Sequence, residues 1–290
     1  MNFSDKLMRG EFAVTGEITP HKGVNPGRIR EVAKHLIGVV DAINVTDNQR
    51  SSVKASSLAV SRLLIEWGGE PIYQLTCRDR NRIALQSDLL GAHMLGLRNV
   101  LIISGDHPAI GDHPDAKPVY DLDSVRLIET IGGLNQGRDM SGGRLDENCD
   151  FFAGAAVNPC AHDQEVELIK ARRKIAAGAM FFQTQVVYDV DMFKAFMSQL
   201  PKEAKVLAGI IPLKSEKMAD FMSTKMPGVS IPADVIAEIA KAKDPCKAGL
   251  DQAVRIIREI RPHASGVHIM ALGLEEHVKT IISEAGLHGL

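Results

Sequence analysis

The sequence predicts an α/β fold of the (β/α)₈ TIM-barrel class, and two observations support this prediction. Short β-branched or apolar runs alternate eight times with amphipathic stretches along the 290 residues, as strands and helices alternate in this barrel. A polar or charged residue also ends nearly every run, and the carboxyl ends of the strands are where such barrels hold their active sites. The eight runs are Phe12–Pro20, Asp41–Asp47, Glu70–Cys77, Asn99–Asp106, Phe152–Pro159, Met180–Tyr188, Lys205–Leu213 and Gly266–Leu272.

The stretches between the runs carry helix signals. Val53–Trp67 places apolar residues on one stripe and charged or hydroxyl residues on the opposite face. Arg80–Leu97 repeats this pattern, and Gly96 stands where a helix can end in a left-handed residue. After the seventh run, Ala233–Ala242 and Leu250–Ile260 both have a helical pattern. The sequence therefore predicts one extra helix before the last strand.

Length and composition indicate one barrel domain over residues 1–290, because this fold typically takes roughly 250 residues and no low-complexity linker interrupts the chain. The 34 basic and 36 acidic residues balance, so we expect a small-molecule ligand and no nucleic acid. No uncharged apolar stretch reaches membrane-spanning length, and the amino terminus has no signal-peptide core. We therefore expect no membrane span and a cytoplasmic location.

Spacing argues against a metal site and against a dinucleotide fingerprint. The four cysteines are far apart, with no pair at the spacing of zinc or iron–sulfur ligands. His107 and His113 occur in two Asp-His-Pro triplets, which turn formation explains adequately. The Gly132-Gly133 and Gly142-Gly143 pairs do not link a strand to a helix. We expect no bound metal.

Two carboxylates at strand ends are candidates for chemistry. Glu17 ends a strand whose apolar walls would disfavour the charged carboxylate, and this suits a general acid; pairing with a basic residue at the barrel mouth explains it about equally well. Asp106 ends the most apolar strand and follows Gly105, which lets backbone approach a ligand closely. Capping of the next turn is the alternative for Asp106.

Two amides in the sixth run are candidates for ligand binding. Strand alternation places Gln183 and Gln185 on the same face. Amides that face a barrel interior need hydrogen-bond partners. A heterocycle with paired donors and acceptors would supply them.

Several separate motifs, in order along essentially the whole chain, resemble the methylenetetrahydrofolate reductase family. They are Gly16-Glu17-Ile18-Thr19-Pro20, Asn44-Val45-Thr46-Asp47, Gln74-Leu75-Thr76-Cys77-Arg78-Asp79, Gly105-Asp106, and Gly178-Ala179 running on to Thr184-Gln185. The resemblance implies flavin-dependent reduction of 5,10-methylenetetrahydrofolate to 5-methyltetrahydrofolate. Glu17 matches the family's acid, Asp106 the carboxylate beside flavin and pterin, and Gln185 the amide that holds folate.

The resemblance also implies a flavin site, with FAD as the expected cofactor. The matching cofactor positions are Thr46, Gln74, Ser104, Gly105, Asp106, Tyr120, Asn158, His162, Glu167 and Lys174. Gln74 replaces the family's histidine and Ser104 its arginine, and Met270 stands where an aromatic ring is expected. These departures make FMN the alternative flavin.

The resemblance leaves the electron donor open between NADH or NADPH and a partner electron-transfer subunit. It also implies an oligomer. Two other classes of function remain open at this point. One is a pterin-binding methyltransferase barrel without flavin, and the other is a non-catalytic folate-binding subunit of a larger assembly.

Overall fold

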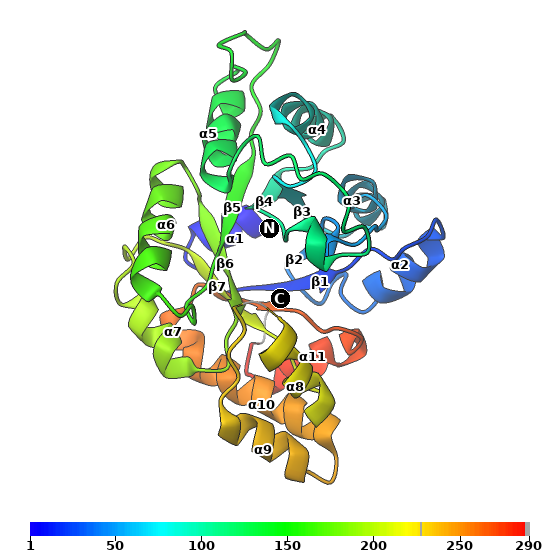
Figure 1. Cartoon of the computed structure of the whole chain (residues 1–290), viewed down its shortest axis with the longest axis vertical. Helices are drawn as coiled ribbons and strands as arrows, with labels where there is room; N and C mark the ends of the chain where they lie inside the picture. The colour runs from blue at the N-terminus through cyan, green and yellow to red at the C-terminus, as the bar shows by residue number, and fades with distance from the viewer. Residues whose placement is uncertain (227, 288–290) are drawn as a thin grey trace.

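The computed structural model, which describes residues 1–226 and 228–287, is a closed barrel of parallel strands and confirms the predicted (β/α)₈ class. Neighbouring strands pair in chain order, and β8 closes on β1 through Thr15 and His268. Figure 1 shows the strands as a ring with helices around it. All the predicted runs contain a strand: β1 (Ala13–Ile18), β2 (Ala42–Val45), β3 (Pro71–Thr76), β4 (Asn99–Ile103), β5 (Phe152–Val157), β6 (Phe181–Val186), β7 (Val206–Ile210) and β8 (Gly266–Ile269).

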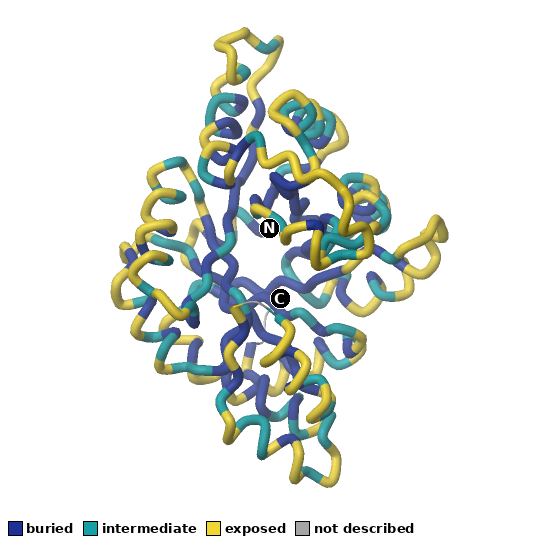
Figure 2. The backbone as a smooth tube through the Cα atoms, viewed as in Figure 1, coloured by how far each residue is buried: buried dark blue, intermediate teal, exposed yellow. Residues whose placement is uncertain are grey.

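Most of the helices cover the outside of the barrel, with exposed residues on their outer faces (Figure 2). The helices are α1 (Phe3–Met8), α2 (Pro26–Ala33), α3 (Ser57–Glu66), α4 (Arg82–Met94), α5 (Ser124–Asn135), α6 (Gln164–Ala176), α7 (Val190–Met197), α8 (Glu216–Lys225), α9 (Ala233–Lys241), α10 (Pro245–Ile260) and α11 (Val278–Glu284). Among these described residues, no helix has both the length and the apolar character needed to cross a membrane.

The segment between β7 and β8 holds more helix than the sequence predicted. Within the described residues, three helices (α8, α9 and α10) lie there, whereas the pattern indicated two. The missed helix, α8, buries only Ala219 and Met222 among its ten residues, so its apolar stripe is narrow. Asp244 accepts a hydrogen bond from Lys247 N and caps α10, with Pro245 in its first turn.

The amino-terminal end of the barrel is closed by an apolar layer. Phe3 and Leu7 of α1 are fully buried against the first inward-facing residue of most strands. The Phe3 ring meets Phe152 and Phe181 edge-on, at centroid distances of 6.0 and 5.4 Å. Both carboxylate oxygens of Glu70 accept hydrogen bonds from Phe3 N, which holds the start of α1 in place. This end of the barrel is therefore a packed core.

The next inward-facing layer is polar. Thr15, Asn44, Gln74, Gln183 and His268 are all buried, and each lies on a different strand. Buried polar side chains cost free energy unless they are hydrogen-bonded, so they are rarely retained in a core for packing alone. This layer forms the floor of a cavity that opens toward the carboxyl ends of the strands.

Candidate active site

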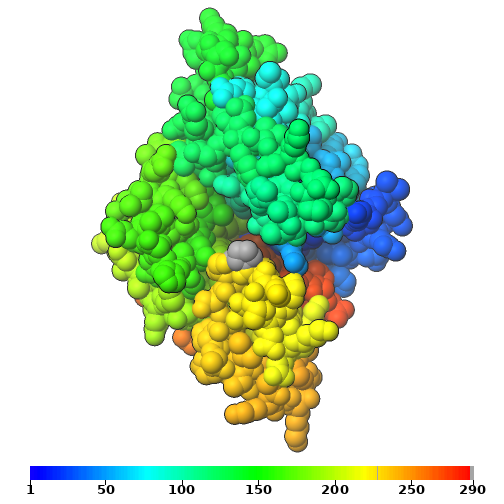
Figure 3. All heavy atoms as spheres, viewed as in Figure 1, coloured from blue at the N-terminus to red at the C-terminus, as the bar shows by residue number. Residues whose placement is uncertain are grey.

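A cavity of about 530 Å³ lies at the carboxyl end of the barrel, within the size range of small-molecule sites. Figure 3 shows the surface hollowed near the middle of this face, between green and yellow segments. Residues of β1, β3, β4, β5, β6 and β8 line it, together with the start of α5 and one face of α6. The strand ends that a TIM barrel uses for chemistry therefore surround one space.

Glu17 and His268 form the buried pair at one side of the cavity floor. Glu17 is 8% exposed and His268 3%, and His268 Nε2 lies 3.3 Å from Glu17 Oε2. The other ring nitrogen, Nδ1, lies 3.0 Å from Thr15 Oγ1 and 3.2 Å from Asn44 Nδ2. Within the described residues, Glu17 Oε1 is buried without a hydrogen-bond partner. The carboxylate thus has one oxygen beside His268 and one buried oxygen whose hydrogen bonding is unsatisfied in the described residues.

Three amides extend the polar surface across the floor. Gln74 Nε2 donates to Asn44 Oδ1 at 3.4 Å, and Gln183 Nε2 donates to Thr15 Oγ1 at 3.5 Å. Gln183 Oε1 is a second buried atom without a partner in the described part of the chain. Gln183 and Gln185 both line the cavity, as alternation predicted, although the β6–β7 register shifts between Gln183 and Val186. The floor therefore offers both amide donors and amide acceptors.

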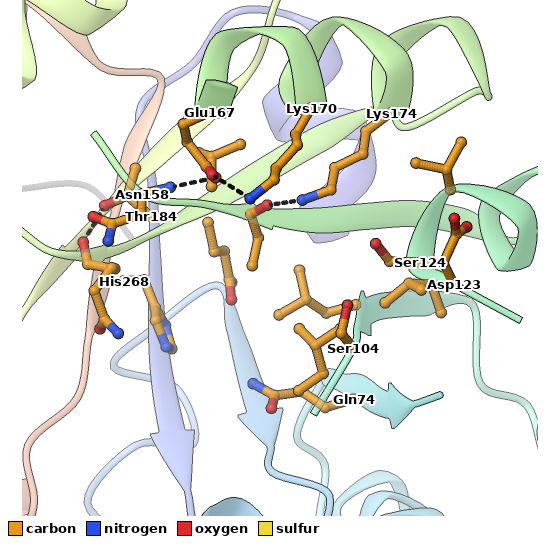
Figure 4. Close-up of a pocket in the computed structure, with 18 of the residues that line it drawn as sticks. Gln74, Ser104, Asp123, Ser124, Asn158, Glu167, Lys170, Lys174, Thr184 and His268 are labelled. Atoms are coloured by element: carbon orange, nitrogen blue, oxygen red, sulfur yellow. Dashed lines mark hydrogen bonds and ion pairs between the residues drawn. The ribbon is translucent and has the colours of Figure 1, made fainter. Parts of the chain in front are cut away.

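Helix α6 brings positive charge to another side of the cavity. Lys170, Arg173 and Lys174 occupy neighbouring positions on one face of this helix and line the cavity. Figure 4 shows Lys170 and Lys174 pointing in from the helix, across from Gln74 and Ser104. Lys174 Nζ donates to the carbonyl of Ala156 at 2.6 Å. Burial lowers the pKa of Lys174 below that of an ordinary lysine, because desolvation disfavours the charged form.

Glu167 connects this helix to the end of β5. Its Oε1 accepts a hydrogen bond from Asn158 N at 3.0 Å, and its Oε2 lies 3.6 Å from Lys170 Nζ. The Asn158 side chain donates to the carbonyl of Gly228 at 2.9 Å. Asp163 accepts from Val166 N and so caps the start of α6. The helix and its cations are therefore held in a defined position beside the cavity.

Seven of the residues predicted for the site line this cavity. They are Glu17, Gln74, Ser104, Asn158, Glu167, Lys174 and Gln185. Five different strands or the segments that directly follow them, plus α6, supply these residues. The structure therefore brings together side chains as far apart in sequence as Glu17 and Gln185.

Five predicted residues lie outside the lining as far as the structure describes it: Thr46, Gly105, Asp106, Tyr120 and His162. Thr46 is buried, and its Oγ1 has no partner among the described residues. Asp106 and His162 are exposed. Tyr120 donates its hydroxyl hydrogen to the carbonyl of Gly105 at 3.0 Å. Their roles in binding stay predictions.

Three other residues at the ends of predicted runs lie outside the cavity lining as described, namely Asp47, Thr76 and Cys77. Asp47 Oδ2 accepts hydrogen bonds from Thr76 N, Thr76 Oγ1 and Arg80 Nη1, at 3.0, 2.9 and 2.7 Å. Burial raises the pKa of the Cys77 thiol to about 12. Asp47 is held away because it pairs with Arg80, which also pairs with Asp88 of α4 at 2.7 Å, so this group joins β2 to β3 and α4.

Several cavity residues were missed by sequence reasoning. His268 is the one polar side chain in the strand run Val267 to Ile269, and such a residue is a signal that could have identified it. Lys170 and Arg173 share the face of Lys174 at helical spacing, which is a second usable signal. Gln183, by contrast, was predicted together with Gln185 as an inward-facing amide, and it lines the cavity.

Comparison with known proteins places the chain in a family. The model of the family described as methylenetetrahydrofolate reductase matches residues 2–286. Methylenetetrahydrofolate reductase 2 of Schizosaccharomyces pombe is 26% identical over 315 residues, covering 98% of this chain and 47% of that protein. The 5,10-methylenetetrahydrofolate reductase of Salmonella typhimurium is 24% identical over 242 residues, covering 78% of this chain and 76% of that protein. The chain thus spans less than half the length of the fission yeast relative.

A solved structure is similar over almost the full length. It is described as an uncharacterized protein from Clostridium thermocellum that binds two copies of 5-methyl-5,6,7,8-tetrahydrofolic acid. The TM-score is 0.68 at 18% sequence identity, and the match covers 98% of both chains. At this identity the likeness shows the fold. The family match over residues 2–286 shows more: the chain belongs to the methylenetetrahydrofolate reductase family.

Proposed function

We propose that this protein reduces 5,10-methylenetetrahydrofolate to 5-methyltetrahydrofolate with a bound flavin. The observation that carries the proposal is Glu17 at the floor of a polar cavity. One oxygen of this buried carboxylate lies beside His268, and the other has no partner among the residues that the structure describes. Membership of the family and the names of the relatives support the substrate class. The ligand named for the Clostridium thermocellum structure is the product of this reaction.

The hydrogen-bonding groups and cations that line the cavity are chemically suited to a flavin. An isoalloxazine ring offers paired donors and acceptors at its edge, which Gln74 and the unpartnered Gln183 Oε1 can match. A flavin phosphate needs cations, which Lys170, Arg173 and Lys174 supply. FAD is the first expectation and FMN the alternative. When bound, the flavin supplies the hydride.

The side chains of the site would then divide the remaining work. Glu17 would deliver a proton from Oε1 to the folate nitrogen whose bond to the bridging methylene breaks, leaving the methylene carbon electrophilic. Gln185 would hold the pterin by its amide, and Asp106 would approach from the cavity mouth to favour positive charge on the folate. The closed apolar layer below the floor keeps water from entering behind the reacting groups.

The electron donor and the assembly are part of the proposal. NADH or NADPH would reduce the flavin at the open carboxyl face, or a partner electron-transfer subunit would do so, and the chain would act as an oligomer in the cytoplasm. A screen of NADH, NADPH and reduced viologen as donors separates the first two from a partner-dependent enzyme. Activity with reduced viologen but with neither NADH nor NADPH would indicate that a partner subunit supplies the electrons.

Colour tests the proposal directly. The purified protein should show flavin absorption, dithionite should bleach it, and methylenetetrahydrofolate should restore it. The mass of the flavin released by heating decides between FAD and FMN. A colourless protein that takes up neither flavin would contradict the proposal and favour a flavin-free pterin methyltransferase. Bound flavin that folate cannot reoxidise would favour a non-catalytic folate-binding subunit.

A further inference from the structure

His268 of β8 faces Glu17 of β1 across the β1–β8 seam, and its side chain contacts the Glu17 carboxylate. Thr15 and His268 are paired across the seam, and Glu17 is the next inward-facing residue of β1. We propose that His268 is a positioning residue. It holds one carboxylate oxygen of Glu17 and leaves the other aimed at the substrate. This inference rests on the proposed function.

The hydrogen-bond network specifies which ring nitrogen of His268 carries the hydrogen. Asn44 Nδ2 lies 3.4 Å from the carbonyl of Gly16, and Asn44 Oδ1 accepts from Gln74 Nε2 at 3.4 Å. These two contacts identify which atom of the Asn44 amide is the nitrogen and which is the oxygen. The amide nitrogen, which can only donate, therefore faces His268 Nδ1 at 3.2 Å.

Because Nδ1 faces a donor, it must be the acceptor of a neutral imidazole, and the hydrogen must lie on Nε2. That Nε2–H group points to Glu17 Oε2 at 3.3 Å. Thr15 Oγ1 also lies 3.0 Å from Nδ1; it accepts from Gln183 and has two acceptors for its one hydrogen, Nδ1 and the carbonyl of Val267 at 3.5 Å. The polar layer thus fixes the tautomer, and the tautomer makes the ring a hydrogen-bond donor to the carboxylate.

This arrangement makes the two oxygens of Glu17 different. Oε2 is occupied by His268, whereas Oε1 is buried and without a partner in the described residues. A proton that Glu17 carries to substrate is therefore best placed on Oε1, and the carboxyl group cannot rotate freely without losing the bond to His268. Holding the acid in one orientation matters because a displacement of about 1 Å can cost about 100-fold in rate.

Two amide substitutions separate this role from simple packing. The side-chain amide nitrogen of His268→Gln falls near the position of Nε2, so it can still donate to Glu17. The shorter amide of His268→Asn falls near Nδ1, so it reaches Asn44 and Thr15 but leaves Glu17 Oε2 unbound. Both variants replace the ring by a smaller polar side chain, which makes them matched controls for the loss of packing.

We expect kcat for folate reduction to fall about 100-fold in His268→Asn and to be at least about 10-fold higher in His268→Gln than in His268→Asn. The Michaelis constant for folate and the rate of flavin reduction by the donor should change little in either variant. Equal losses of kcat in both variants, with flavin content unchanged, would overturn the positioning role. A wild-type protein that reduces no folate with any donor would instead contradict the proposed function.

A spectroscopic measurement tests the arrangement without relying on turnover. Nitrogen-15 NMR of histidine-labelled wild-type protein, with the His268 signals identified by their loss in His268→Gln, reports the protonation of each ring nitrogen. We expect a neutral ring with the hydrogen on Nε2. A hydrogen on Nδ1 would overturn the proposal, and this result can be read even if the Asn variant does not fold.

Discussion

At the scale of single residues, the site separates proton delivery from cofactor anchoring. Glu17 and the amides lie on the strands at the floor, whereas the cations lie on α6. A substitution on one side should therefore leave the task of the other side intact.

Replacing Glu17 by Gln removes the acid and keeps the shape of the side chain. We expect the variant to bind flavin and to be reduced normally by the donor, while folate reduction falls by about 100- to 10,000-fold, the usual contribution of a general acid. Stopped-flow measurement of the two half-reactions checks this. Normal folate turnover in Glu17→Gln would refute the acid assignment.

Asp106 tests whether the exposed loop after β4 takes part in binding. If its carboxylate approaches flavin and folate when both are bound, Asp106→Asn should shift the flavin potential and weaken folate binding, each measurable by titration. Asp115→Asn, an exposed carboxylate in the same loop, serves as the control and should change neither. If Asp106→Asn behaves like Asp115→Asn, then Asp106 has a structural role.

Lys174 tests the phosphate side. Lys174→Gln should weaken FMN binding by roughly 10-fold or more, because a hydrogen bond to a charged group contributes about 1.5–3 kcal/mol, and should barely change riboflavin binding. In the protein without ligand, burial lowers the pKa of Lys174 below the usual lysine value of 10.5. The charge of Lys174 is therefore lost as pH rises through that lowered pKa. The preference for FMN over riboflavin should therefore decline at a lower pH than an exposed lysine would give. A preference that is the same in the wild type and Lys174→Gln would contradict the assignment.

At the scale of elements, the strands and much of the site follow from the sequence, and the departures have identifiable causes. The strands were predictable because both faces are buried, and Glu17 and Gln185 because strand ends converge. The position of Asp106 could not be predicted, because it depends on how the loop turns after Gly105, whose φ is +84°. His268 was missed because its role depends on pairing with β1, across 251 residues of sequence.

Helix α1 was also not predicted, since it has only six residues, yet it closes the bottom of the barrel. Phe3→Ala should reduce the free energy of unfolding by about 3–5 kcal/mol through the cavity that it leaves. Denaturant unfolding followed by circular dichroism measures this. Met8→Ala, in the same helix but 55% exposed, is the control and should cost no more than about 0.5 kcal/mol. Similar losses in both variants would contradict the packing role of Phe3.

At the scale of the whole molecule, the barrel holds an apolar lower layer and a polar upper cavity within one ring of strands. Leu101 belongs to the lower apolar cluster and also lines the cavity, so the two halves touch among the described residues. The polar layer between them is joined by its own hydrogen bonds rather than by contacts to Phe3. We therefore expect the two halves to contribute independently to stability.

This independence can be measured by combining Phe3→Ala with saturating flavin. A ligand at about 100 times its dissociation constant adds about 2.7 kcal/mol to the free energy of unfolding. The same increment should appear in the wild type and in Phe3→Ala, within about 0.5 kcal/mol, because Phe3 lies outside the cavity lining as described and separated sites usually act additively. An increment that is smaller in Phe3→Ala would mean that the lower layer holds the cavity in its binding form, with Leu101 as the residue through which the loss is transmitted.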